Sequence, residues 1–378
     1  MPISITASVA PHRDYCAMAS LLELSHELLH CIFVELHPAD LSSLSRTCRD
    51  LSSYVKGNRL LHKDVYLKRY DQPAQGKESE HDWEARLHNF TKLERILESE
   101  DRDVKYKHLG HVATYMNKLI ETAGKDPETS ANMRLLTSLF KKQINIDTIL
   151  CSSSLFGRAG NNSQRAAETA DLRQASAKLH CLYGVPVEVV PGRPRYTMGP
   201  GYHTRSPLSC TRLRPYPTHS YARSLVYDLR QYTDGTLWGP FVDDGSQRVD
   251  WEKVEAVMIV LGYNLNLFAE RSNGQSPRVW DKPFRGASPN SYLSRPLVPG
   301  PPAKDELDQA IVLNQPRQAA LDAEDPYGVS GTWRRVVCFL DYNDLYSFNF
   351  ASPIPDDRPR EPIENEEGTI ELGETVCY

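Results

Sequence analysis

The sequence predicts an α+β protein with a helical N-terminal half and a β-rich C-terminal half. As far as residue 184, apolar residues recur at spacings of three and four, the period of an amphipathic helix. After residue 185, Pro and Gly become frequent and this period fades. Tyr346, Phe348 and Phe350 alternate with polar residues, as in a half-buried strand. We therefore expect helices followed by a barrel- or sandwich-like β domain.

Composition limits the class of protein. The 378 residues suggest two or three domains, and 40% hydrophobic with 25% charged residues is ordinary globular usage. A net charge of -5 disfavours nucleic acid as the main partner. The eight cysteines include no C-x-x-C pair, which indicates a reducing compartment. The apolar run at 256–261 is too short for a membrane span, so we expect a cytoplasmic or nuclear protein without membrane contact.

Three short helices are predicted near the N-terminus. Residues 24–36 form the first, with Ser25 as N-cap and Glu27 in the first turn. Its apolar face carries Leu28, Leu29, Ile32, Phe33 and Leu36. Spacings of three and four predict a second helix through Leu41, Leu44, Cys48, Leu51 and Val55, ended by Gly57 and Asn58. The third carries Leu60, Leu61, Val65 and Tyr66.

The order of these residues resembles the F-box, a three-helix motif of the adaptor subunits of cullin-type ubiquitin ligases. Ten positions match its usual pattern: Leu24, Glu27, Leu28, Ile32, Leu36, Pro38, Asp40, Leu41, Leu44 and Cys48. Two positions depart from it. Ser25 replaces the usual first Pro, and His62 stands where Trp is common. Ser25 is a good helix start, whereas the loss of Trp removes apolar area from the third helix.

The resemblance implies a non-catalytic protein that binds the Skp adaptor, and through it a cullin, without a cofactor or metal. The residues that it assigns to the adaptor-binding F-box are Leu24, Glu27, Leu28, Ile32, Phe33, Leu36, Pro38, Asp40, Leu41, Leu44 and Cys48. Three helices of this size bury little surface, so a face left apolar would be completed by the partner. The alternative is that these leucines form an ordinary helical domain.

The domain boundaries follow from these patterns. We expect a flexible tail at 1–18, the F-box at 19–70 and a helical connector at 71–184. A β-rich substrate domain spans 185–352, with a Pro-rich loop at 283–302, and an acidic tail spans 353–378. Short segments of the connector and of the later half resemble filamentous-fungal F-box proteins. They lie at 83–84, 93–97, 176–184, 226–230, 238–241, 249–252, 325–328 and 331–333. Helices are expected in the connector at 83–97, 104–122, 130–142 and 164–182.

In the second half, short apolar pieces between turn residues predict the strands. They lie at 225–229, 237–241, 257–261, 333–340 and 345–350. Large aromatic residues favour either a recognition surface or, more often, the packing of a β core. The residues concerned are Trp238, Trp251, Tyr327 and Trp333.

A run of basic residues is the candidate for substrate binding. Six arginines lie between 191 and 223 without an intervening acid, and tyrosines are interleaved with them. Arginine forks bind carboxylate and phosphate, so an acidic or phosphorylated protein segment is a candidate ligand, and RNA stacking is another. The substrate-binding candidates are Arg193, Arg195, Arg205, Arg212 and Arg214. The alternative is a solvated loop, or one neutralised by the acidic tail.

Motifs of catalysis are absent from the sequence. It has no G-x-S-x-G elbow, no P-loop and no H-E-x-x-H. His26 and His30 lie at i and i+4, but without a third ligand nearby an exposed polar face is favoured over a metal site. Two rivals to the ligase subunit remain. One is an F-box scaffold that acts outside ubiquitin transfer, and the other is an enzyme with its site in the β-rich part.

Overall fold

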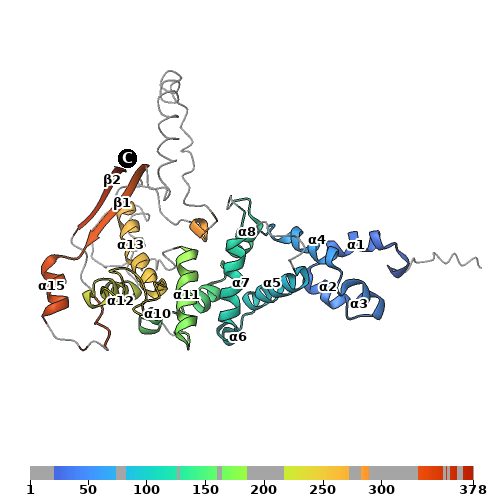
Figure 1. Ribbon diagram of the computed structural model, residues 1–378, viewed down its shortest axis with the longest axis horizontal. Helices are drawn as coiled ribbons and strands as arrows, with labels where there is room; N and C mark the ends of the chain where they lie inside the picture. Colours follow the sequence, from blue (N-terminus) through green and yellow to red (C-terminus); the bar gives the residue numbers. More distant parts are fainter. Residues whose placement is uncertain are drawn as a thin grey trace, which may run out of the picture. The chain divides into compact units, whose positions relative to one another are not determined.

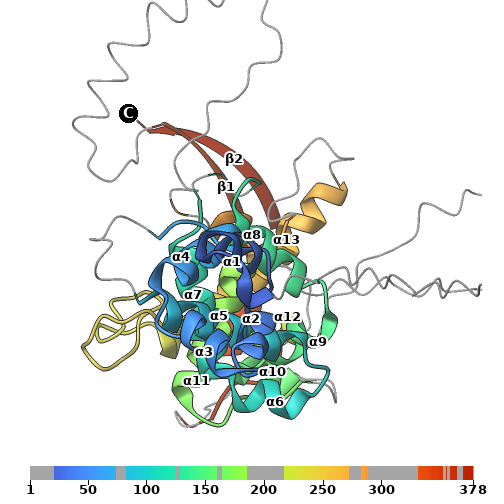
Figure 2. The same ribbon diagram turned by 90° about the vertical axis from the view of Figure 1, so that its right-hand side faces the viewer.

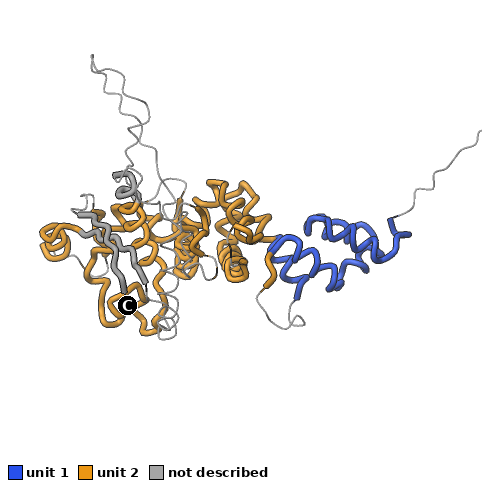
Figure 3. Tube along the Cα trace, turned by 90° about the horizontal axis from the view of Figure 1, so that it is seen from above, with its two compact units in different colours: residues 1–70, 76–91 blue, residues 71–75, 92–378 orange. Residues whose placement is uncertain are grey.

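The computed structural model is helical, and its backbone forms two compact units. It describes residues 21–73, 82–124, 126, 128–159, 164–184, 217–271, 282–287, 289, 331–351, 355, 358–363 and 369–377. The first unit holds residues 1–70 and 76–91, and the second holds 71–75 and 92–378 (Figure 3). Within the described part, no helix is long and apolar enough to cross a membrane.

Short helices build the first unit, drawn in blue in Figure 3. They are η1 (Leu21–Glu23), α1 (His26–Val34), α2 (Pro38–Leu44), α3 (Arg49–Val55), α4 (Arg59–Arg69) and the beginning of α5 (Trp83–Glu98). Their buried faces meet in one core. It contains Leu29, Phe33, Leu41, Leu51, Val55, Leu61, Val65 and Tyr66.

The predicted second helix is divided into α2 and α3. Hydroxyl groups in the intervening turn compete with the helical backbone: Ser45 donates to the carbonyl of Ser42, and Thr47 donates to that of Leu44. Cys48 then has an extended backbone and begins α3 without a side-chain cap. The apolar spacing therefore continues across a break that the hydroxyl residues produce.

Aromatic rings join α4 to the start of α5. Tyr66 lies 5.3 Å from Trp83 and 5.9 Å from Phe90, measured between ring centroids, and Tyr70 lies 5.0 Å from Phe90. Such pairs contribute about 0.5–1.5 kcal/mol each beyond area burial. The polar residues between α4 and α5 therefore connect two helices of the same packed unit.

The second unit contains the remaining described elements. Its first helices are α6 (Arg102–Lys107), α7 (Leu109–Glu121), α8 (Ala131–Leu139), α9 (Gln143–Asn145) and the π-helix η3 (Ile146–Leu150). They are followed by α10 (Ser154–Ala159), α11 (Ala170–Tyr183), α12 (Pro217–Val226), η4 (Leu229–Gln231), α13 (Trp251–Arg271), η5 (Arg285–Ala287) and α15 (Tyr342–Phe350). The helix predicted at 104–122 is interrupted at His108, which joins α6 to α7.

Two polar side chains secure the beginning of this unit. Asp71 accepts from the backbone N–H of Gly124 and of Ala131, each at 2.9 Å, and so fixes the turn before α8. Burial would raise the pKa of Asp71, but its hydrogen bonds, led by that from Ser130, lower it. Lys105 is buried and donates to the carbonyls of Ile96 and Leu97 in the last turn of α5. Burial lowers its pKa to about 8.

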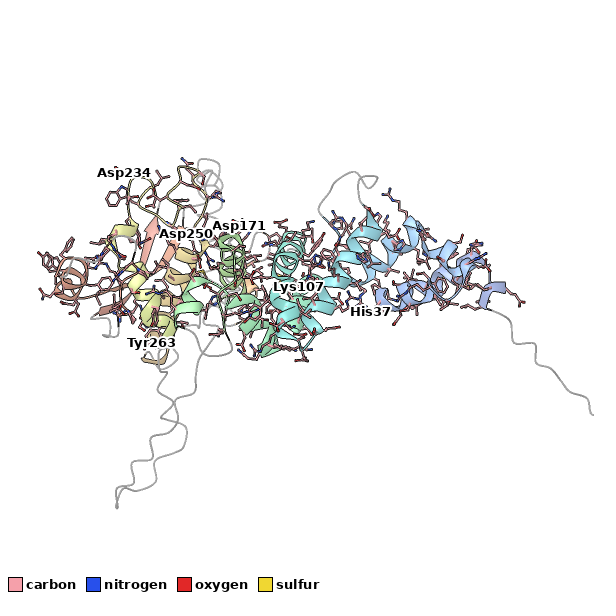
Figure 4. The ribbon with its side chains drawn as sticks, turned by 90° about the horizontal axis from the view of Figure 1, so that it is seen from below. His37, Lys107, Asp171, Asp234, Asp250 and Tyr263 are labelled. Atoms are coloured by element: carbon pink, nitrogen blue, oxygen red, sulfur yellow. The ribbon has the colours of Figure 1, made fainter. Side chains whose placement is uncertain are left out.

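Helices α11 and α13 pack through polar as well as apolar groups. Asp250, labelled in Figure 4, accepts from the backbone N–H of Glu252 at 3.1 Å and so caps α13. The Gln174 side chain of α11 donates to the same carboxylate at 2.8 Å. Nearby apolar residues on α10, α12 and α13 form a cluster of Leu155, Ala222, Ala256, Ile259 and Val260.

The prediction of a β-rich C-terminal domain is wrong. In the part of the chain that the structure describes, the strands are one antiparallel pair, β1 (Gly331–Phe339) and β2 (Thr369–Cys377) (Figure 2). Gly331 lies opposite Cys377, and Phe339 lies opposite Thr369. Of the predicted strands, only that at 333–340 falls on a strand. The apolar run at 257–261 lies inside the helix α13, and 345–350 lies inside α15.

The described residues at 358–363, within the predicted acidic tail, are attached to α12, η4 and α15. The Arg360 guanidinium donates to the carboxylate of Asp228 at 3.1 Å and to the carbonyl of Asn349 at 3.1 Å. Arg230 binds the same aspartate at 2.8 Å. Burial alone would raise the pKa of Asp228, but the bonds from both arginines lower it. This segment therefore belongs to the second unit.

Candidate adaptor-binding surface

Helix α1 has one face in the core of the first unit and a second apolar face in solvent. Leu29 and Phe33 are buried. Leu28 and Ile32 lie one turn apart on the other side and are 53% and 41% exposed. Leu21 and Leu22, just before α1, are also exposed. We call Leu28 and Ile32 the α1 apolar surface. An apolar face left in water on a folded unit is typical of an interaction site.

The start of α1 is fixed by its cap. Ser25 has an extended backbone, and its hydroxyl accepts from the backbone N–H of Leu28 at 3.4 Å. The pKa of Glu27 is lowered, first by its own backbone N–H and then by the Ser25 hydroxyl. The predicted N-cap is thus confirmed, and a serine begins the helix that carries the exposed surface.

Removing this cap should loosen α1 without changing its apolar surface. We expect Ser25→Ala to cost the helix about 1 kcal/mol, because the Leu28 N–H loses its partner. Hydrogen exchange of the segment 21–36 should then speed up by about fivefold, whereas Ser25→Asp, which keeps an acceptor, should leave it unchanged. Equal exchange in the Ala variant and the wild type would show that the cap does not stabilise α1.

Contacts from α3 and α4 hold α1 in place. His30 on α1 lies 2.8 Å from the Asp64 carboxylate on α4, and Glu35 pairs with Lys68. The Tyr54 hydroxyl of α3 donates to the carbonyl of His26 at 2.9 Å. His62 is buried, and its Nδ1 lies 2.9 Å from the carbonyl of Asn58. The residue at the usual Trp position therefore still lies in the core.

The comparison with protein families agrees with this geometry. The family model for the F-box domain matches residues 21–63, which include η1, α1, α2, α3 and the beginning of α4. The chain carries an F-box domain. No curated protein and no solved structure gives a match. The predicted resemblance to F-box proteins is confirmed for this segment, and Ser25 and His62 both lie inside it.

The structure divides the predicted F-box residues into three groups. Phe33, Pro38 and Leu41 are buried in the core, and Leu24, Leu36 and Leu44 are half-buried. Glu27, Leu28, Ile32, Asp40 and Cys48 are exposed. The spacing of apolar residues assigned Leu28, Leu29, Ile32 and Phe33 to one face of the helix. It did not show that Leu28 and Ile32 face the solvent while Leu29 and Phe33 face the core. Exposed Leu21, Leu22 and Leu60 were not predicted, and no sequence signal marks them as exposed.

The predicted substrate-binding arginines lie outside the described residues. They are Arg193, Arg195, Arg205, Arg212 and Arg214. The sixth arginine of that run, Arg223, is buried in α12 and donates to the carbonyl of Ile363 at 3.3 Å. It therefore helps to hold the second unit together and is not available at the surface.

The sequence favoured a buried core position for four large aromatic residues of the second half, but the two whose side chains the structure describes are exposed or half-buried. Trp238 is exposed, and its indole N–H donates to Asp234 at 3.0 Å. Trp251 is half-buried at the start of α13. Tyr327 and the side chain of Trp333 lie outside the described part. Tyr342, Tyr346 and Phe350 follow one another on an exposed face of α15.

Among the described residues, two histidine-containing pairs are explained by packing. His26 stacks on Tyr54 and His30 binds Asp64, so this pair belongs to the packing of α1. His180 and Glu255 form a close pair at 2.6 Å between α11 and α13, but their side chains are 1% and 0% exposed. A substrate in solvent does not reach such a pair. Among the described residues, no group of three metal-binding side chains occurs.

Proposed function

We propose that this F-box protein is a substrate receptor of an SCF-type ubiquitin ligase. Its F-box binds the Skp adaptor, which links it to a cullin, and its second unit binds a protein substrate. It acts by bringing two proteins close together, because a recruited conjugating enzyme transfers ubiquitin to a substrate held nearby. The chain itself forms no covalent intermediate. This function places the protein in the cytoplasm or nucleus.

The observation that carries the proposal is the α1 apolar surface. Within a folded F-box, Leu28 and Ile32 remain in water although their neighbours Leu29 and Phe33 are buried. Complete burial of a fully exposed leucine or isoleucine gains about 1.5–3 kcal/mol. Because Leu28 and Ile32 are each about half exposed, a partner that covers both gains roughly this amount from the two together. The match of the F-box family model to residues 21–63 supports the same partner, the Skp adaptor.

The second unit supports the receptor role by its size and independence. It has its own apolar cluster on α10, α12 and α13 and its own polar networks around Asp71 and Asp228. Its helices also bear an exposed aromatic face on α15. A unit of this kind, joined to an F-box in one chain, is suited to hold a second protein.

Reconstitution separates a ligase subunit from a scaffold. The full chain, the adaptor, a cullin with its RING subunit and ubiquitin-charged conjugating enzyme would be incubated with proteins that co-purify with the chain. We expect ubiquitin on a bound protein, and none with a Leu28→Asp, Ile32→Asp variant. Adaptor binding without ubiquitin transfer to any bound protein would favour the scaffold.

A further inference from the structure

The second unit has a basic pocket on the surface of α8. Its volume is about 360 Å³, and it lies between α8 and residues 282–285. In Figure 1 these residues belong to the short orange segment near α8. Four of its lining residues are cations: Arg134 and Lys141 from the α8 side, and Lys282 and Arg285 from the opposite segment. One lining residue, Glu128, is acidic. The pocket thus has an excess of three positive charges in a chain whose net charge is -5.

A buried aromatic anchor positions the cations of residues 282–285. Phe284 is fully buried, and its ring lies edge-on to Phe140 at 5.5 Å and to Tyr183 at 5.2 Å. Its backbone N–H donates to the carbonyl of Tyr183 at 2.8 Å. Its φ is +60°, a strained backbone conformation for a bulky residue. The packing offsets this strain and leaves Lys282 and Arg285, on either side of Phe284, at the pocket.

The carboxylate of Glu128 neutralises one of the four cations of the pocket, Lys282. Glu128 pairs with Lys282 at 2.7 Å, and the bond from Lys282, with the nearby charges of Lys282 and Arg285, lowers the pKa of Glu128. Asp126 lies near Glu128 and opposes this effect. Both partners of the pair are more than half exposed, so water screens their attraction and the pair contributes little to stability. An incoming anion can therefore exchange with it at small cost.

We propose that this pocket binds the phosphate group of a phosphorylated protein segment. A phosphate dianion has three acceptor oxygens, which suit two guanidinium groups and two ammonium groups. The hydroxyls of Thr137 and Ser138 also line the pocket and supply neutral donors. Met133 and Pro283 add apolar lining for the flanking chain. The inference deepens the proposed function, because it names the chemical class of the substrate.

The same observations disfavour RNA. Single-stranded RNA needs a basic groove together with exposed aromatic faces on which bases stack. Here the aromatic lining residue, Phe284, is fully buried and packed between two other rings. The chain also has a net negative charge, which repels a polyanion. One phosphate with a short peptide on each side fits this pocket better.

The test uses fluorescent peptides and the full chain. A pool of nine-residue peptides, randomised around a central phosphoserine, would be titrated by anisotropy beside the same pool with serine. We expect binding of the phosphorylated pool alone. Charge-assisted hydrogen bonds contribute about 1.5–3 kcal/mol, so Arg134→Glu with Lys141→Glu should weaken binding at least tenfold. Both side chains are exposed, so the fold should tolerate the change.

Two further variants separate binding from a structural role. Glu128→Gln removes the competing carboxylate and should tighten binding several-fold, which loss of structure does not do. Lys107→Glu is the matched control, because Lys107 lies exposed on α6 and does not line the pocket (Figure 4). It should leave binding unchanged.

Several outcomes would overturn the proposal. These are equal binding of the serine pool, no loss on charge reversal, inorganic phosphate binding as tightly as the peptide pool, or tighter binding of a uridine oligonucleotide. Adaptor capture by the same preparations is measured in parallel. Adaptor capture without phosphopeptide binding would remove this pocket as a substrate site and leave the F-box function intact.

Discussion

Aspartate in place of both Leu28 and Ile32 is expected to abolish capture of the Skp adaptor and to leave the first unit folded. Both side chains are exposed in the free chain, so the charges are accommodated in water. In the complex the same charges would be buried against an apolar partner, and two apolar contacts would be lost as well. A loss of about 3 kcal/mol or more, at least a hundredfold in affinity, follows. A pull-down with the adaptor measures it, and circular dichroism checks the fold.

Two controls make this result specific. Leu229→Asp changes an exposed leucine of the second unit, and it should leave adaptor capture unaltered. Phe33→Asp puts a charge into the core, where Phe33 is 1% exposed, and it should unfold the first unit. If the double variant at Leu28 and Ile32 still captures the adaptor at the wild-type level, the α1 apolar surface is not the binding site.

Mild acid is expected to destabilise the second unit through His219. This residue is buried in α12, and its ring lies 4.0 Å from that of Tyr263. Burial, with a smaller effect from the charge of Arg223, lowers the pKa of His219 from 6.5 to about 3. Between these values the unfolded chain binds a proton that the folded chain does not bind. Stability is therefore present above pH 6.5 and is lost as the pH falls towards 3.

The loss should be large enough to measure. Each pH unit in this window costs about 1.4 kcal/mol, so the free energy of unfolding should fall by about 2–3 kcal/mol between pH 6 and pH 4 from this residue. His219→Phe keeps a ring beside Tyr263 and does not titrate. Urea unfolding at several pH values should show that this variant loses less stability in acid than the wild type. Parallel pH profiles would contradict the assignment to His219.

The first F-box helix and the motif itself were predictable because short-range signals agree there, whereas the division of the second predicted helix into α2 and α3 was not. Ser25, Glu27 and the spacing of apolar residues all indicate the start of the same helix, and the ordered matches from Leu24 to Cys48 indicate the motif. The spacing of apolar residues does not show which side of the helix faces the core and which side faces the solvent. Leu28 and Leu29 are chemically identical neighbours, and only the packing of α3 and α4 against α1 decides which one is buried.

The C-terminal fold was not predictable from local pattern. A short apolar run such as 257–261 fits a buried strand as well as the middle of a helix, and here α13 extends for 21 residues around it. In α15 the alternating aromatics suggested a strand. The helix is instead begun by the Asp341 side chain, and Asn349 connects it to the carbonyl of Tyr227 at 3.0 Å. Such long-range contacts have no local signal.

The most direct test of the central claim is calorimetric titration of the wild-type full chain with the purified Skp adaptor at several temperatures. We predict one-to-one binding at sub-micromolar affinity with a negative heat-capacity change, because Leu28 and Ile32 leave water in the complex. Absence of binding by the folded wild-type chain would contradict the account. In that case Ser25 and His62 would mark an F-box that keeps its fold but has lost its partner.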